Sequence, residues 1–174
     1  MEKGKPMNTN ILDHISINKR NGCEQRNSQL LFVHNQSIIL FKKALFKGKL
    51  RRFFSFFTRK SVNLQSITAE ISHASTYSIS DCGYQSIPLK RIIGSENRCQ
   101  DFDFEFSPRS VNTLNRWVKV ADLFLLDEII PPVELIQIGW NYFVRDGHHR
   151  ISVAKALGKE YIDGCVRIYL LKEE

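Results

Sequence analysis

The sequence has few cysteines and no apolar run long enough to cross a bilayer. A spanning helix needs about 18 or more consecutive apolar residues, and no stretch approaches that length. The cysteines are scattered at Cys23, Cys82, Cys99 and Cys165, with no C-x-x-C pair. Such spacing favours neither a disulfide framework nor a local zinc site. With no signal-like N-terminus either, these absences predict a protein of the reduced cytoplasm, without a transmembrane segment.

Acidic residues are missing from one long part of the chain. Residues 25–69 carry a charge of +9, from Arg26, Lys42, Lys43, Lys47, Lys49, Arg51, Arg52, Arg59 and Lys60. The whole chain has a formal charge of +7, so the remainder carries −2. The basic character therefore belongs to one segment, which does not indicate a uniform nucleic-acid-binding surface. DNA remains a candidate partner of residues 25–69 alone.

The length of 174 residues and the hydrophobic content of 43% are those of one globular domain. We divide the chain into a polar, flexible N-terminus at residues 1–36, a basic helical segment with a loop at 37–86, and a domain at 87–174. The polar text "NKRNGCEQRNSQ" is the reason for placing a loop in the first part.

A basic amphipathic helix is predicted by the stretch "SIILFKKALFKGKLRRFFSFFTRK". Its apolar residues recur at helical spacing in two sets, Ile38, Phe41 and Leu45, and Phe46, Leu50, Phe53, Phe54 and Phe57. One interpretation is attachment to a membrane surface or a nucleic acid. The other is a helix that docks its phenylalanine face on the domain and leaves its lysines in water. We favour the docked helix.

The stretch "DFDFEF" alternates acids with phenylalanines, so an extended chain would place Asp101, Asp103 and Glu105 on one side. Three carboxylates at this spacing suit a divalent metal ion. An edge strand with one solvated face explains the same pattern, and we favour the strand.

The remaining patterns predict an α/β (α+β) fold, a small mixed sheet surrounded by helices. A helix is expected in "SVNTLNRWVKVADLFLLDE", with Asn112 as its N-cap and a break at Pro131 and Pro132. After Pro131 and Pro132, one strand is expected from Val133 and a second over "WNYFVR", with Gly139 to Asn141 as the turn between them. A helix closed by Gly158 and a final strand, "YIDGCVRIYLL", complete the domain.

A polar cluster, "DGHHR", lies between the second of these strands and the helix. A helix N-terminus exposes unpaired N–H groups and attracts anions, and Gly147 allows a close backbone approach. Arg150 offers donors that match phosphate oxygens, and His148 and His149 donate hydrogen bonds or accept protons. Asp146 is a candidate for helix capping or for orienting a histidine or magnesium. A solvated turn would explain the cluster without function, but its apolar flanks favour a site.

The text "PPVELIQIGWNYFVRDGHHRISVAKALGKEYIDGCV" resembles the ParB-like nuclease domain of the ParB/sulfiredoxin superfamily, over residues Ile87 to Ile168. The upstream Gly94, Ser95 and Arg98, and the pair Arg116-Trp117, are similar to a narrower bacterial group within it. Sulfiredoxins place a reactive cysteine where this chain has His148, so sulfinic-acid repair is not expected. ParB clamps carry Glu-Arg-Arg in the box and a further DNA-binding domain, so centromere-type clamping is not expected.

The resemblance implies that the box binds nucleotide phosphates through Gly147, His148, His149 and Arg150. Ser95 and Arg98 are expected as a second phosphate contact. Members with a similar box resemble kinases that phosphorylate free serine, which implies phosphoryl transfer or nucleotide hydrolysis with Mg²⁺ and a nucleoside di- or triphosphate. His148, Asp146 and Glu134 are the candidate catalytic bases. A regulatory or DNA-associated module without catalysis is the alternative.

Overall fold

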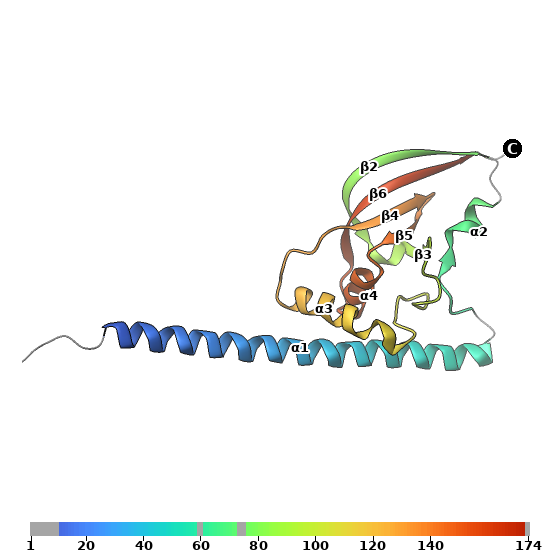
Figure 1. Cartoon of the computed structure of the whole chain (residues 1–174). Helices are drawn as coiled ribbons and strands as arrows, with labels where there is room; N and C mark the ends of the chain where they lie inside the picture. Colours follow the sequence, from blue (N-terminus) through green and yellow to red (C-terminus); the bar gives the residue numbers. More distant parts are fainter. Residues whose placement is uncertain (1–10, 59–60, 73–75, 173–174) are drawn as a thin grey trace, which may run out of the picture.

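The computed structural model describes residues 11–58, 61–72 and 76–172 (Figure 1). The strands are β1 (Gln65–Ser66), β2 (Thr76–Pro88), β3 (Ile92–Ser95), β4 (Val133–Ile138), β5 (Asn141–Asp146) and β6 (Tyr161–Lys172). The helices are α1 (Ile11–Thr58), α2 (Ile67–Ile71), α3 (Leu114–Leu125) and α4 (His148–Ala156), with short 3-10 turns at Leu89–Arg91 and Val111–Thr113. The expected α/β class and N-terminal helix are confirmed.

The six strands form one mixed sheet in the order β1-β3-β5-β4-β6-β2. The pairs β1–β3, β3–β5 and β4–β6 are parallel, whereas β4–β5 and β2–β6 are antiparallel. Helices α3 and α4 lie between the sheet and α1 (Figure 1). Since the sheet includes β1 and most of β2, it begins before residue 87, where we placed the start of the domain.

The elements expected in the C-terminal half are found with small shifts of their ends. Gly158 has φ 74°, and its N–H donates to the Lys155 carbonyl at 3.1 Å. Helix α4 therefore ends just before Gly158, as its sequence predicted. The prediction that Asn112 is the N-cap is wrong. The Ser110 side chain accepts from the Asn112 N–H at 3.3 Å, and α3 follows from Leu114.

The "DFDFEF" stretch is a loop, so the expected edge strand is wrong. Asp103 is buried, whereas the side chains of Asp101 and Glu105 are 44% and 50% exposed. The Asp103 carboxylate accepts from the backbone N–H groups of Glu105 at 3.0 Å and Ser107 at 2.8 Å, and these bonds bend the chain. The three carboxylates do not share a side, and within the described ranges no three metal-ligating side chains come together.

Helix α1 is longer than expected, because residues 11–36 are helical rather than a loop. No proline and a single glycine, Gly22, occur in that part, so nothing there breaks a helix. The first ten residues of the expected flexible N-terminus, and Arg59 and Lys60 of the basic segment, lie outside the described residues. No described helix, α1 included, is both long and apolar enough to span a membrane.

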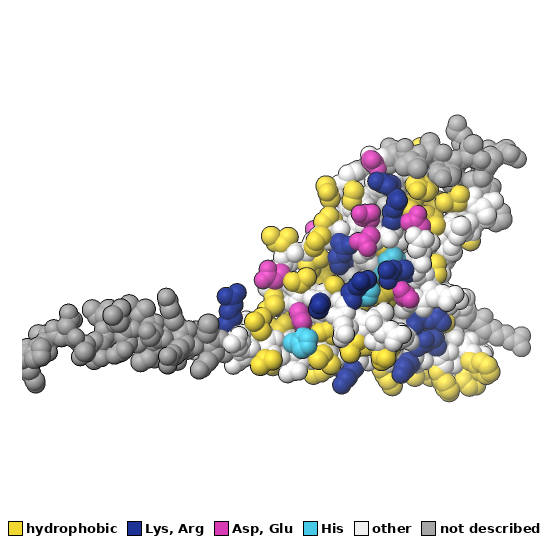
Figure 2. All heavy atoms as spheres, viewed as in Figure 1, with side chains coloured by type: hydrophobic (Ala, Val, Ile, Leu, Met, Phe, Trp, Pro, Cys, Tyr) yellow, Lys and Arg dark blue, Asp and Glu magenta, His cyan; other side chains and the backbone are white. Residues whose placement is uncertain are grey.

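The two apolar sets on α1 have different surroundings. Phe41 and Leu45 are buried, and the Phe41 ring meets Trp117 of α3 edge-on at 5.4 Å. The second set, Phe46, Leu50, Phe53, Phe54 and Phe57, is 44–68% exposed. Figure 2 shows hydrophobic side chains gathered at the C-terminal end of α1, with Lys and Arg beside them. The docked-helix interpretation is therefore correct for the first set and wrong for the second.

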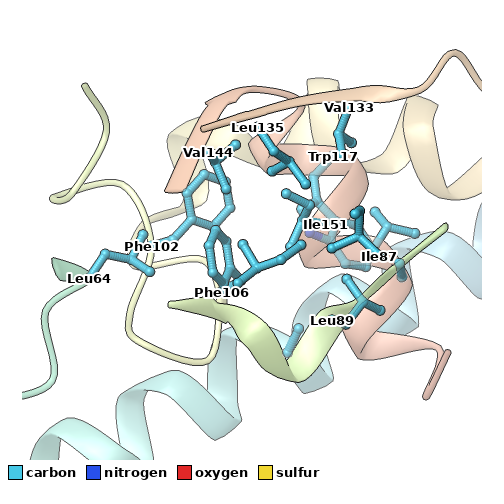
Figure 3. Close-up of a cluster of buried hydrophobic side chains, with 14 of the residues drawn as sticks. Leu64, Ile87, Leu89, Phe102, Phe106, Trp117, Val133, Leu135, Val144 and Ile151 are labelled. Carbon is cyan, nitrogen blue, oxygen red and sulfur yellow. The ribbon is translucent and has the colours of Figure 1, made fainter. Parts of the chain in front are cut away.

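The main core lies between the sheet and α3 and α4 (Figure 3). Its largest members include Phe102, Phe106 and Trp117, all of them fully buried. The Trp117 indole N–H donates to the Ser152 hydroxyl of α4 at 2.8 Å, so the buried polar atom has a partner. A second, smaller cluster joins Ile67 of α2 to Ile136 and Phe143 of the sheet. The packing of the main core is separate from this cluster. This packing fixes α4 against the sheet.

Candidate functional site

The turn between β5 and α4 brings the backbone close to its neighbours. Gly147 has φ 99° and ψ 17°, a left-handed conformation that favours glycine. A Cβ atom at this position would lie 2.6 Å from Val133 Cγ1. The Ile151 N–H donates to the Gly147 carbonyl at 3.0 Å, so the N–H groups before it have no acceptor inside the helix. These groups form the positive end of α4.

A cavity of about 310 Å³ lies at this helix start. Its lining residues are Arg98, Arg116, Val120, Leu123, Ile130, Pro131, Asp146, Gly147, His148, His149 and Arg150. All five residues of the "DGHHR" cluster and Arg98 therefore meet there, as the expected site requires. Ser95 and Glu134 are not among the lining residues. Glu134 is exposed on β4, where it pairs in register with Asp146.

Arg150 is held by neighbouring protein groups. Its Nη1 donates to the carbonyls of Pro131 at 2.8 Å and Pro132 at 2.6 Å, and its Nη2 donates to Asp146 Oδ2 at 2.5 Å. The guanidinium thus ties the loop before β4 to the start of α4. Asp146 does not cap the helix, because the N-cap residue is Gly147 and no side chain makes a cap bond. Both Nη atoms of Arg150 thus donate to protein oxygens, which leaves fewer of its donors for a phosphate.

Arg98 and Arg116 are the other two cations of the cavity. Arg98 follows β3 and makes a loose ion pair with Asp101 at 3.4 Å. Arg116 is exposed on α3, and it forms no ion pair with any residue of the described ranges. Both guanidinium groups are therefore better placed than Arg150 to meet an anion in solution.

His148 is anchored by Ser95. The Ser95 Oγ accepts from the backbone N–H groups of Asn97 at 3.2 Å and Arg98 at 2.9 Å, which occupy its two lone pairs. Its O–H therefore donates to His148 Nε2 at 2.7 Å, which leaves the ring proton on Nδ1. Burial, followed by the charge of Arg98, lowers the pKa of His148 to about 4. His148 is uncharged at neutral pH.

His149 is uncharged for the same kind of reason. Burial, followed by the charges of Arg116 and Arg98, lowers its pKa to about 4. Its ring meets Phe102 edge-on at 5.4 Å. His149 Nε2 is buried, and no group in the described part of the chain hydrogen-bonds to it. The positive charge of the cavity therefore comes from its arginines and the helix start, and it is opposed by the carboxylate of Asp146.

Arg116 and the apolar wall of the cavity, formed by Val120, Leu123 and Ile130, were not among the residues expected at the site. Arg116, Val120 and Leu123 follow one another at helical spacing of four and three residues, so they share one face of α3. This spacing is a signal that the sequence does carry. It does not tell which element the face meets, and that depends on the packing of α3 against α4.

Comparison with known proteins finds a distant structural similarity. No protein-family model matches the chain, and no curated protein matches it. Among solved structures, the chain is similar to a crystal structure of sulfiredoxin from Arabidopsis thaliana, with 18% sequence identity and a TM-score of 0.37. The match covers 52% of this chain and 85% of that chain. So low a score carries no conclusion about function, which has to come from the geometry of the site.

Proposed function

We propose that the chain binds a phosphorylated small molecule, a nucleoside phosphate, in the cavity at the start of α4. The observation that supports this most is the convergence of Arg98 and Arg116 with the unpaired N–H groups of the helix start. Phosphate oxygens accept from both kinds of donor, and the end of a helix favours negative charge.

The lining favours a ligand with one anionic and one apolar part. Val120, Leu123 and Ile130 form an apolar wall beside the two arginines. The volume of about 310 Å³ is at the lower end for small-molecule sites. Phosphate groups would lie at the helix start, and a base or another flat apolar group would contact the wall.

In this proposal magnesium binds together with the phosphates of the ligand and not at a separate protein site. Among the described residues, Asp146 is the one carboxylate that lines the cavity, and it already accepts from Arg150. Mg²⁺ prefers oxygen ligands and is commonly held by one or two carboxylates together with substrate phosphates. The phosphates would therefore supply most of its ligands, with Asp146 as the protein contact.

Catalysis has weaker support than binding. The unprotonated nitrogen of His148 accepts from Ser95, and a pKa of about 4 makes this histidine a weak base at neutral pH. Glu134 does not line the cavity. Asp146 is therefore the remaining candidate base for phosphoryl transfer or nucleotide hydrolysis. Phosphate release with the tightest ligand, compared between wild type and Asp146→Asn, tests this step.

The binding proposal is tested by calorimetric titration with ATP, ADP and CTP, each with Mg²⁺. We expect Arg98→Ala and Arg116→Ala to weaken binding on the order of tenfold each, because each removes a charged hydrogen-bond donor. Lys119→Ala is the matched control, since Lys119 is exposed on α3 but does not line the cavity. Absence of binding by the wild-type chain, or equal losses in the control, would contradict the proposal.

A further inference from the structure

One face of α1 is apolar and unusually exposed. Its members, which we call the phenylalanine face, are Ile39, Phe46, Leu50, Phe53, Phe54 and Phe57, all 44–68% exposed. Aromatic side chains of this size normally bury most of their surface. A continuous row of them in water indicates a surface that contacts another body.

The described part of the chain does not cover this face. Helix α1 docks on the domain through Ser37, Ala44 and Gly48, which are all buried. Ala44 and Phe46 are two residues apart, and a two-residue step along a helix turns the side chain by about 200°. The docking face and the phenylalanine face therefore point in opposite directions, and ordinary packing of α1 leaves the second one outside.

Positive charge borders the phenylalanine face. Lys42, Lys43 and Lys49 are exposed at neighbouring helical positions, and none forms an ion pair within the described ranges. The segment from residue 25 to residue 69 has no acidic residue. A partner that covers the face has to accept both apolar rings and uncompensated ammonium groups.

We propose that the phenylalanine face binds the surface of an anionic lipid bilayer. An interfacial helix lies along the membrane, inserts its apolar side at the acyl boundary, and places lysines against anionic headgroups. The exposed phenylalanine face and its exposed lysines have this arrangement. Both features of the surface are then satisfied by one partner.

A second copy of the chain suits this face less well. A heptad pattern runs along this face, with Ile39, Phe46 and Phe53 at one inner position and Lys43, Leu50 and Phe57 at the other. Pairing of two copies would therefore enclose the Lys43 ammonium group between the helices. Pairing would also bring two segments of +9 together. DNA would pair with the lysines but would leave the phenylalanines without a contact.

The test uses the full chain and sedimentation with two kinds of vesicle, phosphatidylcholine alone and phosphatidylcholine with phosphatidylglycerol. We expect binding to the anionic vesicles and little to the neutral ones. Phe53→Ser/Phe57→Ser should lower the binding constant on the order of tenfold or more, and Lys42→Gln/Lys49→Gln by roughly fivefold per lysine. Ile129→Ser/Trp140→Ser is the control, because both residues are exposed and lie outside α1.

The outcomes separate the possible partners. Equal binding to both vesicles, or no binding by the wild-type chain, overturns the proposal. Concentration-dependent dimers that the Phe53→Ser/Phe57→Ser variant loses, without vesicle binding, would assign the face to a second copy. Binding to duplex DNA alone would assign the lysines to DNA. Thermal unfolding of each variant shows whether it folds, and the wild-type comparison between vesicles stands without any variant.

Discussion

Ser95 and His148 are 53 residues apart in the sequence, yet the Ser95 Oγ lies 2.7 Å from His148 Nε2. This bond joins the end of β3 to the first residue of α4. The same oxygen accepts from the backbone of Asn97 and Arg98, so it also holds the loop that carries Arg98. Ser95 thus positions two lining residues of the cavity without lining it.

Removal of this hydroxyl should weaken the fold and the site together. We expect Ser95→Ala to lower the free energy of unfolding by about 1–3 kcal/mol, because buried hydrogen-bonding groups lose their partner. Urea unfolding measures this change. Ser86→Ala, at an exposed serine of β2, should leave stability within about 0.5 kcal/mol. An equal loss in both variants would show that the bond has no special part in the fold.

Gly147 should tolerate no side chain, since its left-handed φ and the nearness of Val133 act together. We expect Gly147→Ala to lower the free energy of unfolding by about 2–4 kcal/mol. Gly158→Ala is a matched control, because Gly158 also has a positive φ but an added Cβ would meet nothing within 4 Å. It should cost about 1 kcal/mol. Similar losses in the two variants would contradict the steric part of this explanation.

The free energy of unfolding should fall as the pH falls from about 6.5 to about 4, because His148 and His149 have a lower pKa in the folded chain than in the unfolded chain. His148 and His149 have pKa values of about 4 in the folded chain and an ordinary value near 6.5 when unfolded. Between these values the unfolded chain binds more protons, so acid favours unfolding. The contribution is complete above about pH 6.5 and decreases toward about pH 4, by up to about 3 kcal/mol per histidine.

Urea unfolding at about pH 7 and about pH 5 measures this dependence. The variant His148→Gln/His149→Gln should lose less stability over the same range, since glutamine does not titrate. An unchanged dependence would place the acid-sensitive groups elsewhere in the chain.

Local order between Pro131 and Gly158 was readable from the sequence alone, whereas the helix over residues 11–36 and the loop at residues 101–106 were not. Pro131 and Pro132, Gly147 and Gly158 mark the ends of elements because their backbone restrictions act within a few residues. The apolar spacing between them predicted the strand from Val133, the strand "WNYFVR" and the helix that begins near His148. The α/β class and the polar cluster at a helix start followed from these local signals.

Only the tertiary structure decided which side chains meet and which faces are covered. Arg150, which was expected to bind phosphate, lines the cavity but also donates to the carbonyls of Pro131 and Pro132, and Arg116 of α3 lines the cavity beside it. Periodicity shows that a helix has an apolar face, but it does not show whether packing covers that face. On α1, Phe41 packs on the domain whereas Phe53 and Phe57 remain outside, because contact depends on the shape of distant elements and not on hydrophobicity alone.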